Sequence, residues 1–309
     1  MRNLGSSGLR VSEVGLGCNN FGNRVKDVNV TRRIVDCAID AGITLFDTAD
    51  VYGEKGGSET QLGEVLGEKR KKIVLATKFG MQMNDPEEKG ASRRYILSAV
   101  EASLRRLRTD WIDLYQLHQA DPRTPVEETL RALDDLIRQG KVRYIGCSNV
   151  PAWQVADAQW IARELGTNAF VSCQDEYSLL VRKIEKDLIP AMQHFGLGLL
   201  PYFPLASGLL TGKYRRDKLP PGARLTEHSI LADRYLTESN WSRTEKLEQF
   251  CEARGRTLVE LAFSWLLSRP AVASVIAGAT KPEQVEQNVN ASGWELSAED
   301  LAEIDRITA

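Results

Sequence analysis

Short apolar runs and longer helical patterns alternate along the chain from residue 14 onward. The apolar runs are four to seven residues long and are bounded by polar or glycine-containing loops, which is typical of buried strands. Between them, apolar residues recur every three or four positions, as on one face of a helix. Strand and helix alternate eight times, and the predicted strands cover residues 14–17, 43–46, 73–77, 111–117, 142–147, 170–174, 197–201 and 272–276.

This alternation predicts a (β/α)8 barrel. Successive strands mostly begin about thirty residues apart, the length of one βα unit, and eight such units fit a barrel. A doubly wound open sheet is the alternative, but Gly15–Leu16–Gly17 is followed by Cys18–Asn19–Asn20, so the usual dinucleotide-binding fingerprint is missing. Gly5 and Gly8 indicate an N-terminal β-hairpin, and extra C-terminal helices are expected over 240–254, 257–268 and 297–306.

No shift in composition divides the chain, so we expect one domain over residues 1–309. The 40 basic and 42 acidic residues nearly balance, which argues against a nucleic-acid or membrane-surface partner. Five cysteines occur singly, without a Cys-x-x-Cys pair, so we expect neither a disulfide framework nor a metal site. Met1–Arg10 has no apolar stretch of the signal-peptide kind, and no apolar run reaches membrane-spanning length. A cytoplasmic protein is expected.

Three of the predicted strands end in an ionisable side chain. Asp47 follows the second predicted strand, Lys78 the third and His118 the fourth, while Tyr52 lies in the loop after Asp47. The carboxyl ends of parallel strands meet at one edge, where barrels of this kind carry out their chemistry. We therefore expect these four side chains to gather there, and we expect Asp50 in the same loop to be only a turn residue.

Together, these four residues suggest proton donation to a carbonyl group. Asp47 would keep the Lys78 ammonium charged, and that ammonium would lower the pKa of the Tyr52 phenol from its reference of about 10. Tyr52 could then give a proton to a carbonyl oxygen, and His118 could hydrogen-bond the same oxygen. No nucleophile–base pair of the hydrolase kind is present. The chemistry implied is proton donation to a carbonyl, and the hydride would have to come from another molecule.

Seven ordered motifs extend this picture beyond single residues. They are Phe46–Gly53 (FDTADVYG), Ala76–Lys78 (ATK), Asp113–His118 (DLYQLH), Gly140–Asn149 (GKVRYIGCSN), Gln174–Leu179 (QDEYSL), Gly208–Tyr214 (GLLTGKY) and Pro282–Asn288 (PEQVEQN). With these motifs the chain resembles the aldo-keto reductase family over essentially its whole length. The branch it looks like includes bacterial reductases and potassium-channel β subunits.

The resemblance implies a barrel that binds a nicotinamide cofactor and reduces an aldehyde or ketone to an alcohol. It implies Tyr52 as the general acid, Lys78 and Asp47 as the residues that tune it, and His118 as the residue that orients the carbonyl. Further positions are implied for the cofactor: Ser148, Asn149 and Gln174 at the carboxamide, Tyr202 on the nicotinamide ring, and Leu205, Gly208, Leu209, Lys213, Gly278, Thr280, Lys281, Gln284, Gln287 and Asn288 around the pyrophosphate and adenosine.

Three positions depart from the pattern that the family commonly shows. Phe203 stands where a serine is common, Ala277 where a proline is common, and Gln284 where many NADPH-specific members have an arginine. Thr280 and Lys281 are the candidates to recognise the 2′-phosphate instead. We expect NADPH or NADP⁺ as the cofactor in preference to NADH.

Two other functions fit the same residues. One is a non-catalytic, NADP-binding regulatory subunit of the potassium-channel β type, and the other is a Schiff-base aldolase with Lys78 as the nucleophile. In an enzyme with this barrel, the loops after the strands would determine the small-molecule substrate. The segment 210–238, the loop 81–91 and Phe21 are expected to shape the pocket mouth, and Trp111 to lie at the far end of the barrel.

Overall fold

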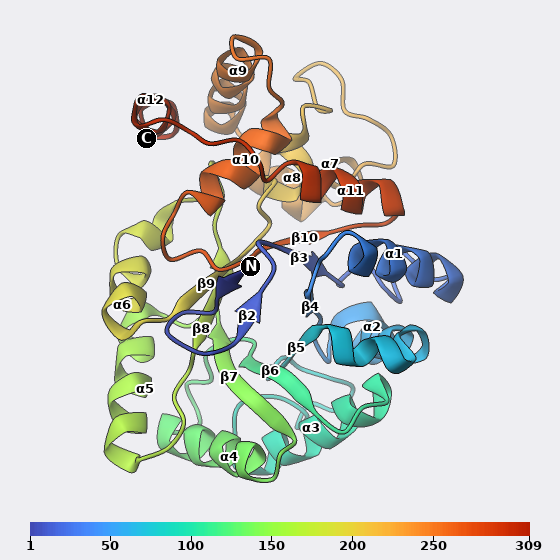
Figure 1. The fold of residues 1–309 in the computed structure, drawn as a ribbon, viewed down its shortest axis with the longest axis vertical. Coiled ribbons are helices and arrows are strands. Elements are labelled where there is room, and N and C mark those ends of the chain that lie inside the picture. The colour runs from blue at the N-terminus through green and yellow to red at the C-terminus, as the bar shows by residue number, and fades with distance from the viewer.

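The computed structural model describes residues 1–309 and contains eight parallel strands in one sheet, ringed by helices (Figure 1). These strands are β3 (Val14–Gly17), β4 (Leu45–Asp47), β5 (Val74–Phe79), β6 (Ile112–Leu117), β7 (Val142–Ser148), β8 (Ser172–Glu176), β9 (Gly198–Tyr202) and β10 (Val275–Gly278). The helices are α1 (Val28–Asp40), α2 (Tyr52–Leu66), α3 (Arg93–Leu107), α4 (Val126–Arg138), α5 (Ala152–Leu165), α6 (Leu188–Phe195), α7 (Arg224–Glu227), α8 (Ser229–Tyr235), α9 (Glu238–Glu252), α10 (Leu258–Leu267), α11 (Pro282–Asn290) and α12 (Ala298–Thr308).

The order of the strands confirms the barrel. Along the sheet the order is β10, β3, β4, β5, β6, β7, β8 and β9, so each strand from β3 onward lies beside its successor in the chain. A parallel bridge between Leu199 of β9 and Val272, just before β10, joins the two edges. An open doubly wound sheet would leave those edges apart, so that alternative is wrong.

The predicted N-terminal hairpin is present and lies across the amino ends of the barrel strands. It pairs β1 (Arg2–Asn3) with β2 (Arg10–Val11), and it appears in front of the strands in Figure 1. Its turn approaches β9 so closely that a Cβ atom on Gly5 would lie 2.3 Å from the carbonyl oxygen of Gly196. Gly5 also has a φ of 60°, so glycine is needed there on both counts. The hairpin leaves the opposite, carboxyl edge open for a site.

The barrel interior is layered because side chains alternate along each strand. Near the hairpin, one apolar cluster fills the interior with residues from the strands and from the hairpin itself: Leu4, Val11, Leu45, Ala76, Leu114, Leu200, Ala273 and Ile276. Two residues further along three of these strands, the inward positions are Asp47, Lys78 and Gln116. An apolar floor therefore supports a polar layer at the carboxyl edge.

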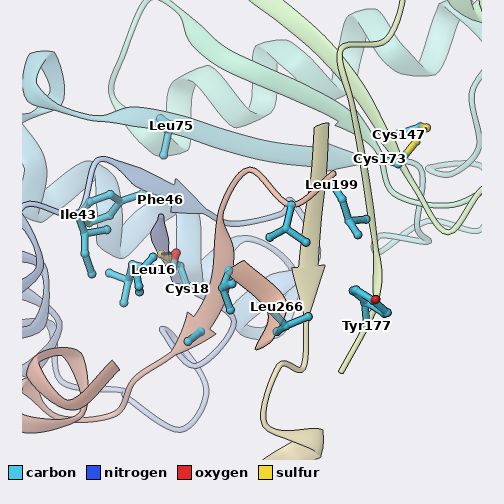
Figure 2. Close-up of a cluster of buried hydrophobic side chains, with 14 of the residues drawn as sticks. Leu16, Cys18, Ile43, Phe46, Leu75, Cys147, Cys173, Tyr177, Leu199 and Leu266 are labelled. Carbon is cyan, nitrogen blue, oxygen red and sulfur yellow. Dashed lines mark hydrogen bonds between the residues drawn. The ribbon is translucent and has the colours of Figure 1, made fainter. Parts of the chain in front are cut away.

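A larger apolar cluster lies between the sheet and its helices. Phe46 and Leu75, whose neighbours in sequence point into the barrel, belong to it (Figure 2). On the other side of the barrel, Cys147 and Cys173 pair across β7 and β8 with their sulfur atoms 3.6 Å apart, and both are free thiols. The cysteines thus serve as core residues.

The extra C-terminal helices are also present. The chain after β9 forms α7 and α8, then α9 and α10, and α12 packs against α9 near the C-terminus (Figure 1). None of the helices is both long enough and apolar enough to cross a membrane. Trp111 lies directly before β6, so it is at the amino end of the barrel, as expected. The Arg70 guanidinium lies over its ring, 4.5 Å from the ring centre.

Candidate active site

A buried ion pair forms the base of the site. The Lys78 ammonium donates to Asp47 Oδ2 at 2.7 Å and to the Thr48 carbonyl at 2.8 Å, and it lies 3.5 Å from the Tyr52 hydroxyl. Lys78 is fully buried and Asp47 is 3% exposed. An unpaired ammonium at this depth would be very unfavourable, so the three oxygen partners are what keep it charged.

Asp47 is held by more than the lysine. Its second oxygen, Oδ1, accepts from Gln174 Nε2 at 2.8 Å and from Gln116 Nε2 at 3.3 Å. Residues of four different strands therefore meet at one carboxylate. Gln116 was not predicted, although it lies two residues before His118 on the inward face of β6, and that alternation could have indicated it.

Backbone hydrogen bonds between the loop after β4 and strand β5 position Tyr52 beside Lys78. After β4 ends, Thr48 N–H donates to the Ala76 carbonyl and Asp50 N–H to the Lys78 carbonyl, so the loop still follows β5. Just beyond Tyr52, Gly53 has a φ of 69°, and a Cβ there would lie 2.4 Å from the Phe21 carbonyl. This turn needs glycine, and it fixes where the tyrosine leaves the loop.

The electrostatics of Tyr52 differ from the sequence prediction. The Lys78 charge does lower the pKa of the phenol, but burial raises it more, and the net pKa lies above its ordinary value. The predicted net lowering is therefore wrong, because the depth of the site cannot be read from the sequence. Tyr52 consequently keeps its proton at neutral pH, as a proton donor must.

The pKa values of His118 and Lys78 are shifted in opposite directions. Burial, followed by the charge of Lys78, lowers the pKa of His118 to about 3, so the imidazole is neutral at physiological pH. Its ring meets that of Tyr52 edge-on, with centroids 5.6 Å apart. Burial also disfavours the Lys78 ammonium, but Asp47 and Tyr52 outweigh this and raise the pKa of Lys78. A lysine held in its charged form cannot attack a carbonyl, which argues against the Schiff-base aldolase.

Above these residues lies a cavity of about 530 Å³ at the carboxyl edge of the barrel. Tyr52, Asp47 and His118 line its base, and Lys78 lies directly beneath it. Of the residues expected at the cofactor, those that line the cavity are Ser148, Asn149, Gln174, Tyr202, Leu205, Gly208, Lys213, Gly278, Thr280 and Gln284. Four others lie outside the lining: Leu209 and Asn288 are buried, and Lys281 and Gln287 are exposed.

Asn149 organises one wall of the cavity. Its side-chain amide donates to the His118 carbonyl at 3.1 Å and to Ser148 Oγ at 2.9 Å, and its Oδ1 accepts from the Tyr202 hydroxyl at 2.8 Å. Asn149 also adopts a φ of 53°, which asparagine tolerates better than most residues. The wall is therefore preorganised, with polar groups from β6, β7 and β9 linked through one side chain.

The segment after β9, which also lines the cavity, has a strained backbone. Phe203, Ala206 and Ser207 have φ values of 52°, 46° and 56°, and Gly208 follows at 103°. Such left-handed runs turn backbone N–H groups toward one side, and strain of this kind is concentrated at ligand sites. Two polar atoms of lining residues, Ser207 Oγ and Arg224 Nε, are buried without a hydrogen-bond partner. These features fit a large ligand with anionic and polar groups.

Two expectations about the mouth are wrong. Phe21 is completely buried in the main core, because its loop folds back against the Gly53 turn, and it does not line the cavity. The loop 81–91 contributes no lining residue either. Its end is fixed by two hydrogen bonds, from the Gly90 N–H to the Gly80 carbonyl and from the Ala91 N–H to Asp121 Oδ2. The segment 210–238 does contribute, through Thr211, Lys213 and residues 222–224. Arg24 and Arg224 also line the cavity, and no motif pointed to either.

Comparison with known proteins agrees with this geometry. A model of the aldo/keto reductase family matches residues 13–309. The chain belongs to this family. A protein from rice named "Probable voltage-gated potassium channel subunit beta" is 38% identical over 94% of this chain and 90% of its own length.

Two bacterial relatives carry names of enzymes. An "Uncharacterized oxidoreductase YrpG" of Bacillus subtilis is 36% identical over 98% of this chain and 94% of its own length. An "L-glyceraldehyde 3-phosphate reductase" of Escherichia coli K12 is 35% identical over 99% of this chain and 91% of its own length. The chain is thus an NAD(P)H-dependent oxidoreductase of the aldo/keto reductase family.

Asp50 lies in the turn after β4 as expected, but its side chain is also buried, with 1% exposure, and its carboxyl group has few hydrogen bonds. Its Oδ1 has no partner, and its Oδ2 accepts only from the Tyr95 hydroxyl at 3.4 Å. Burial, together with the nearby charge of Glu59, raises the pKa of Asp50 to about 8. Its carboxyl group is therefore protonated in the folded protein at neutral pH.

We predict that Asp50→Asn stabilises the protein more at pH 8 than at pH 5. The folded-state pKa exceeds the unfolded value, so the wild type loses stability as pH rises toward 8, by at most ~1.4 kcal/mol per pH unit. Asparagine does not titrate and escapes this loss. The difference in melting temperature between variant and wild type should widen from pH 5 to pH 8, whereas Asp110→Asn at an exposed position should show a constant difference. A pH-independent gap for Asp50→Asn would contradict the prediction.

Proposed function

We propose that this protein reduces an aldehyde or ketone to an alcohol, with NADPH as the cofactor and Tyr52 as the proton donor. One observation carries the proposal: Tyr52 lines the cavity, and its hydroxyl lies 3.5 Å from an ammonium that is itself paired with a buried carboxylate. A phenol in this setting is protonated before the reaction and has a cation beside it once the proton has left.

The bound nicotinamide would supply the hydride, and the protein's own residues handle the proton. As negative charge develops on the carbonyl oxygen, Tyr52 transfers its proton to that oxygen. Lys78 then stabilises the resulting phenolate, and Asp47 keeps the lysine charged and in place. His118, which is neutral, can donate a hydrogen bond to the same oxygen without competing as an acid.

The cavity wall beyond His118 would hold the cofactor. Ser148, Asn149 and Gln174 offer amide and hydroxyl groups for a carboxamide, and Tyr202 offers a ring face for the nicotinamide. Thr280 and Gln284 line the far end, where Gln284 Oε1 accepts from the Thr280 N–H and hydroxyl. We propose that this end takes the adenosine part of NADPH. Lys281 precedes the first residue of α11, with its own side chain exposed.

A regulatory subunit is the second candidate, because the relative from rice bears the name of a potassium-channel β subunit. Such a protein would bind the cofactor in the same cavity and turn it over slowly or not at all. Binding alone therefore does not separate the two functions, but turnover does.

We predict steady oxidation of NADPH when the purified protein is given simple aldehydes and ketones. The rate should be in the ordinary range for enzymes, about 1–10³ s⁻¹ for a good substrate. NADH should support the same reaction only at higher concentration. Absorbance of the reduced nicotinamide, followed over a panel of carbonyl compounds, tests this. Binding of NADPH without any turnover across the panel would favour the regulatory subunit.

A further inference from the structure

A second group of buried charged side chains lies behind the barrel wall, outside the cavity. Glu59 of α2 is completely buried, and its Oε2 accepts from Arg106 Nε of α3 at 2.7 Å. Its Oε1 accepts from the Thr77 hydroxyl of β5 at 2.6 Å. Desolvation offsets much of the attraction within a buried ion pair, so such pairs contribute little to stability as a rule. This pair instead fixes a geometry, because it joins α2, α3 and β5 at one carboxylate.

The chain just after Tyr52 makes a left-handed turn. Gly53, Glu54 and Lys55 have φ values of 69°, 61° and 69°, and Gly56 follows at 118°. Consecutive left-handed residues are unfavourable for side chains other than glycine, so the surroundings must enforce this conformation. Backbone strain of this kind is concentrated at functional sites, and here it begins at the residue that follows the proposed acid.

Side chains from outside the turn hold it in place. Arg106 packs against Gly56 so closely that a Cβ atom on this glycine would lie 2.7 Å from Arg106 Cδ. Lys55 Nζ donates to the Met83 carbonyl at 2.7 Å and ties the turn to the loop after β5. Glu59, through the ion pair, fixes the arginine that closes one side of the turn.

The two ends of the Tyr52 loop are attached to neighbouring residues of one strand. At its start, the Asp50 N–H donates to the Lys78 carbonyl, and at its end Glu59 accepts from Thr77. Lys78 is also the residue whose ammonium lies 3.5 Å from the Tyr52 hydroxyl. The same short piece of β5 therefore sets the position of the ammonium and the position of the loop that carries the phenol.

We propose that Glu59 is a positioning residue for carbonyl reduction. Through Arg106 and Thr77 it holds the left-handed turn against β5. This keeps the Tyr52 hydroxyl beside Lys78, where proton donation needs it. The inference rests on the proposed function, since it takes Tyr52 to be the acid. Neither Glu59 nor Arg106 lines the cavity, so Glu59 acts only through its neighbours.

Glu59→Gln should lower the rate of a single turnover about 10- to 100-fold, because a displacement of about 1 Å at a reacting group can cost that much. Glutamine keeps the size of the side chain and an acceptor for Thr77, but it removes the charge that holds Arg106. The dissociation constant of NADPH should stay within about twofold of the wild type, since the pair lies outside the cavity. Stopped-flow absorbance with NADPH already bound measures the chemical step apart from product release.

A solvent isotope effect separates positioning from a general loss of structure. A displaced hydroxyl slows proton delivery, so the ratio of the rates in H₂O and D₂O should be larger for Glu59→Gln than for the wild type. The matched control is Asp134→Asn, which alters another buried carboxylate, paired with Arg138 and Asn168 outside the cavity. It should lower the melting temperature but leave the single-turnover rate and the isotope effect unchanged.

Thr77→Val tests the same link if Glu59→Gln does not fold, because it removes only the hydroxyl that binds Glu59 on β5. It should also lower the single-turnover rate and raise the isotope effect. A wild-type rate and isotope effect in either variant, folded by its melting curve, or equal changes in Asp134→Asn, would overturn the positioning role. A wild type that oxidises NADPH with none of the carbonyl compounds would instead refute the proposed function, so the two failures are distinct.

Discussion

Replacing Tyr52 with phenylalanine should lower the turnover number about 10²- to 10⁴-fold while leaving cofactor affinity nearly unchanged. Phenylalanine keeps the ring that meets His118 edge-on but removes the hydroxyl beside Lys78. The carbonyl oxygen then loses its proton donor, because the lowered pKa of His118, about 3, leaves its imidazole uncharged at neutral pH, and an uncharged imidazole is a very weak acid. Initial rates with a simple aldehyde, together with fluorescence titration of NADPH, measure both quantities.

A matched control separates this effect from a general loss of structure. Tyr144→Phe removes a phenolic hydroxyl from β7 near Gly8, at the hairpin end of the barrel, and should leave turnover unchanged. If Tyr52→Phe retained turnover close to that of the wild type, another group would have to deliver the proton, and Tyr52 would lose its role.

The second large effect is expected from Lys78→Met. This substitution leaves Asp47 buried and without its cation, which typically costs roughly 3–5 kcal/mol of stability. It also removes the charge that stabilises the Tyr52 phenolate, so turnover should fall by several orders of magnitude. Chemical denaturation and initial-rate measurements on the same protein would record the two losses together.

A double substitution shows whether the ion pair serves stability or catalysis. Asp47→Asn combined with Lys78→Met removes both buried charges, and Gln116 and Gln174 can still donate to the new amide oxygen. We expect the double variant to regain most of the lost stability but none of the lost turnover. Recovery of turnover along with stability would mean that the pair is only structural.

The sequence could predict the barrel and its reactive edge because both depend on simple periodicities. Alternation along each strand places Asp47, Lys78 and His118 inward, and parallel order brings their strands side by side. Gln116 follows from the same rule and was overlooked only because an amide at a strand end carries no distinctive chemistry.

The remaining features depend on packing that no local pattern encodes. Phe21 was expected at the pocket mouth, but the Gly53 turn draws its loop into the core. Arg24 lies in an irregular loop and Arg224 is the first residue of the four-residue helix α7, so neither belongs to a segment long enough to show a period. The net pKa of Tyr52 depends on how deeply its hydroxyl is buried, and burial outweighs the neighbouring charge that the sequence does indicate.

The most direct test of the account is the product of the reaction. Wild-type protein incubated with NADPH and an aldehyde should form the corresponding alcohol in an amount equal to the NADPH oxidised, and Tyr52→Phe should form it far more slowly with the cofactor still bound. Chromatography measures the alcohol formed, and the loss of nicotinamide absorbance measures the NADPH oxidised. Oxidation of NADPH without matching alcohol, or equal alcohol formation by Tyr52→Phe, would contradict a carbonyl reductase that uses Tyr52 as its acid.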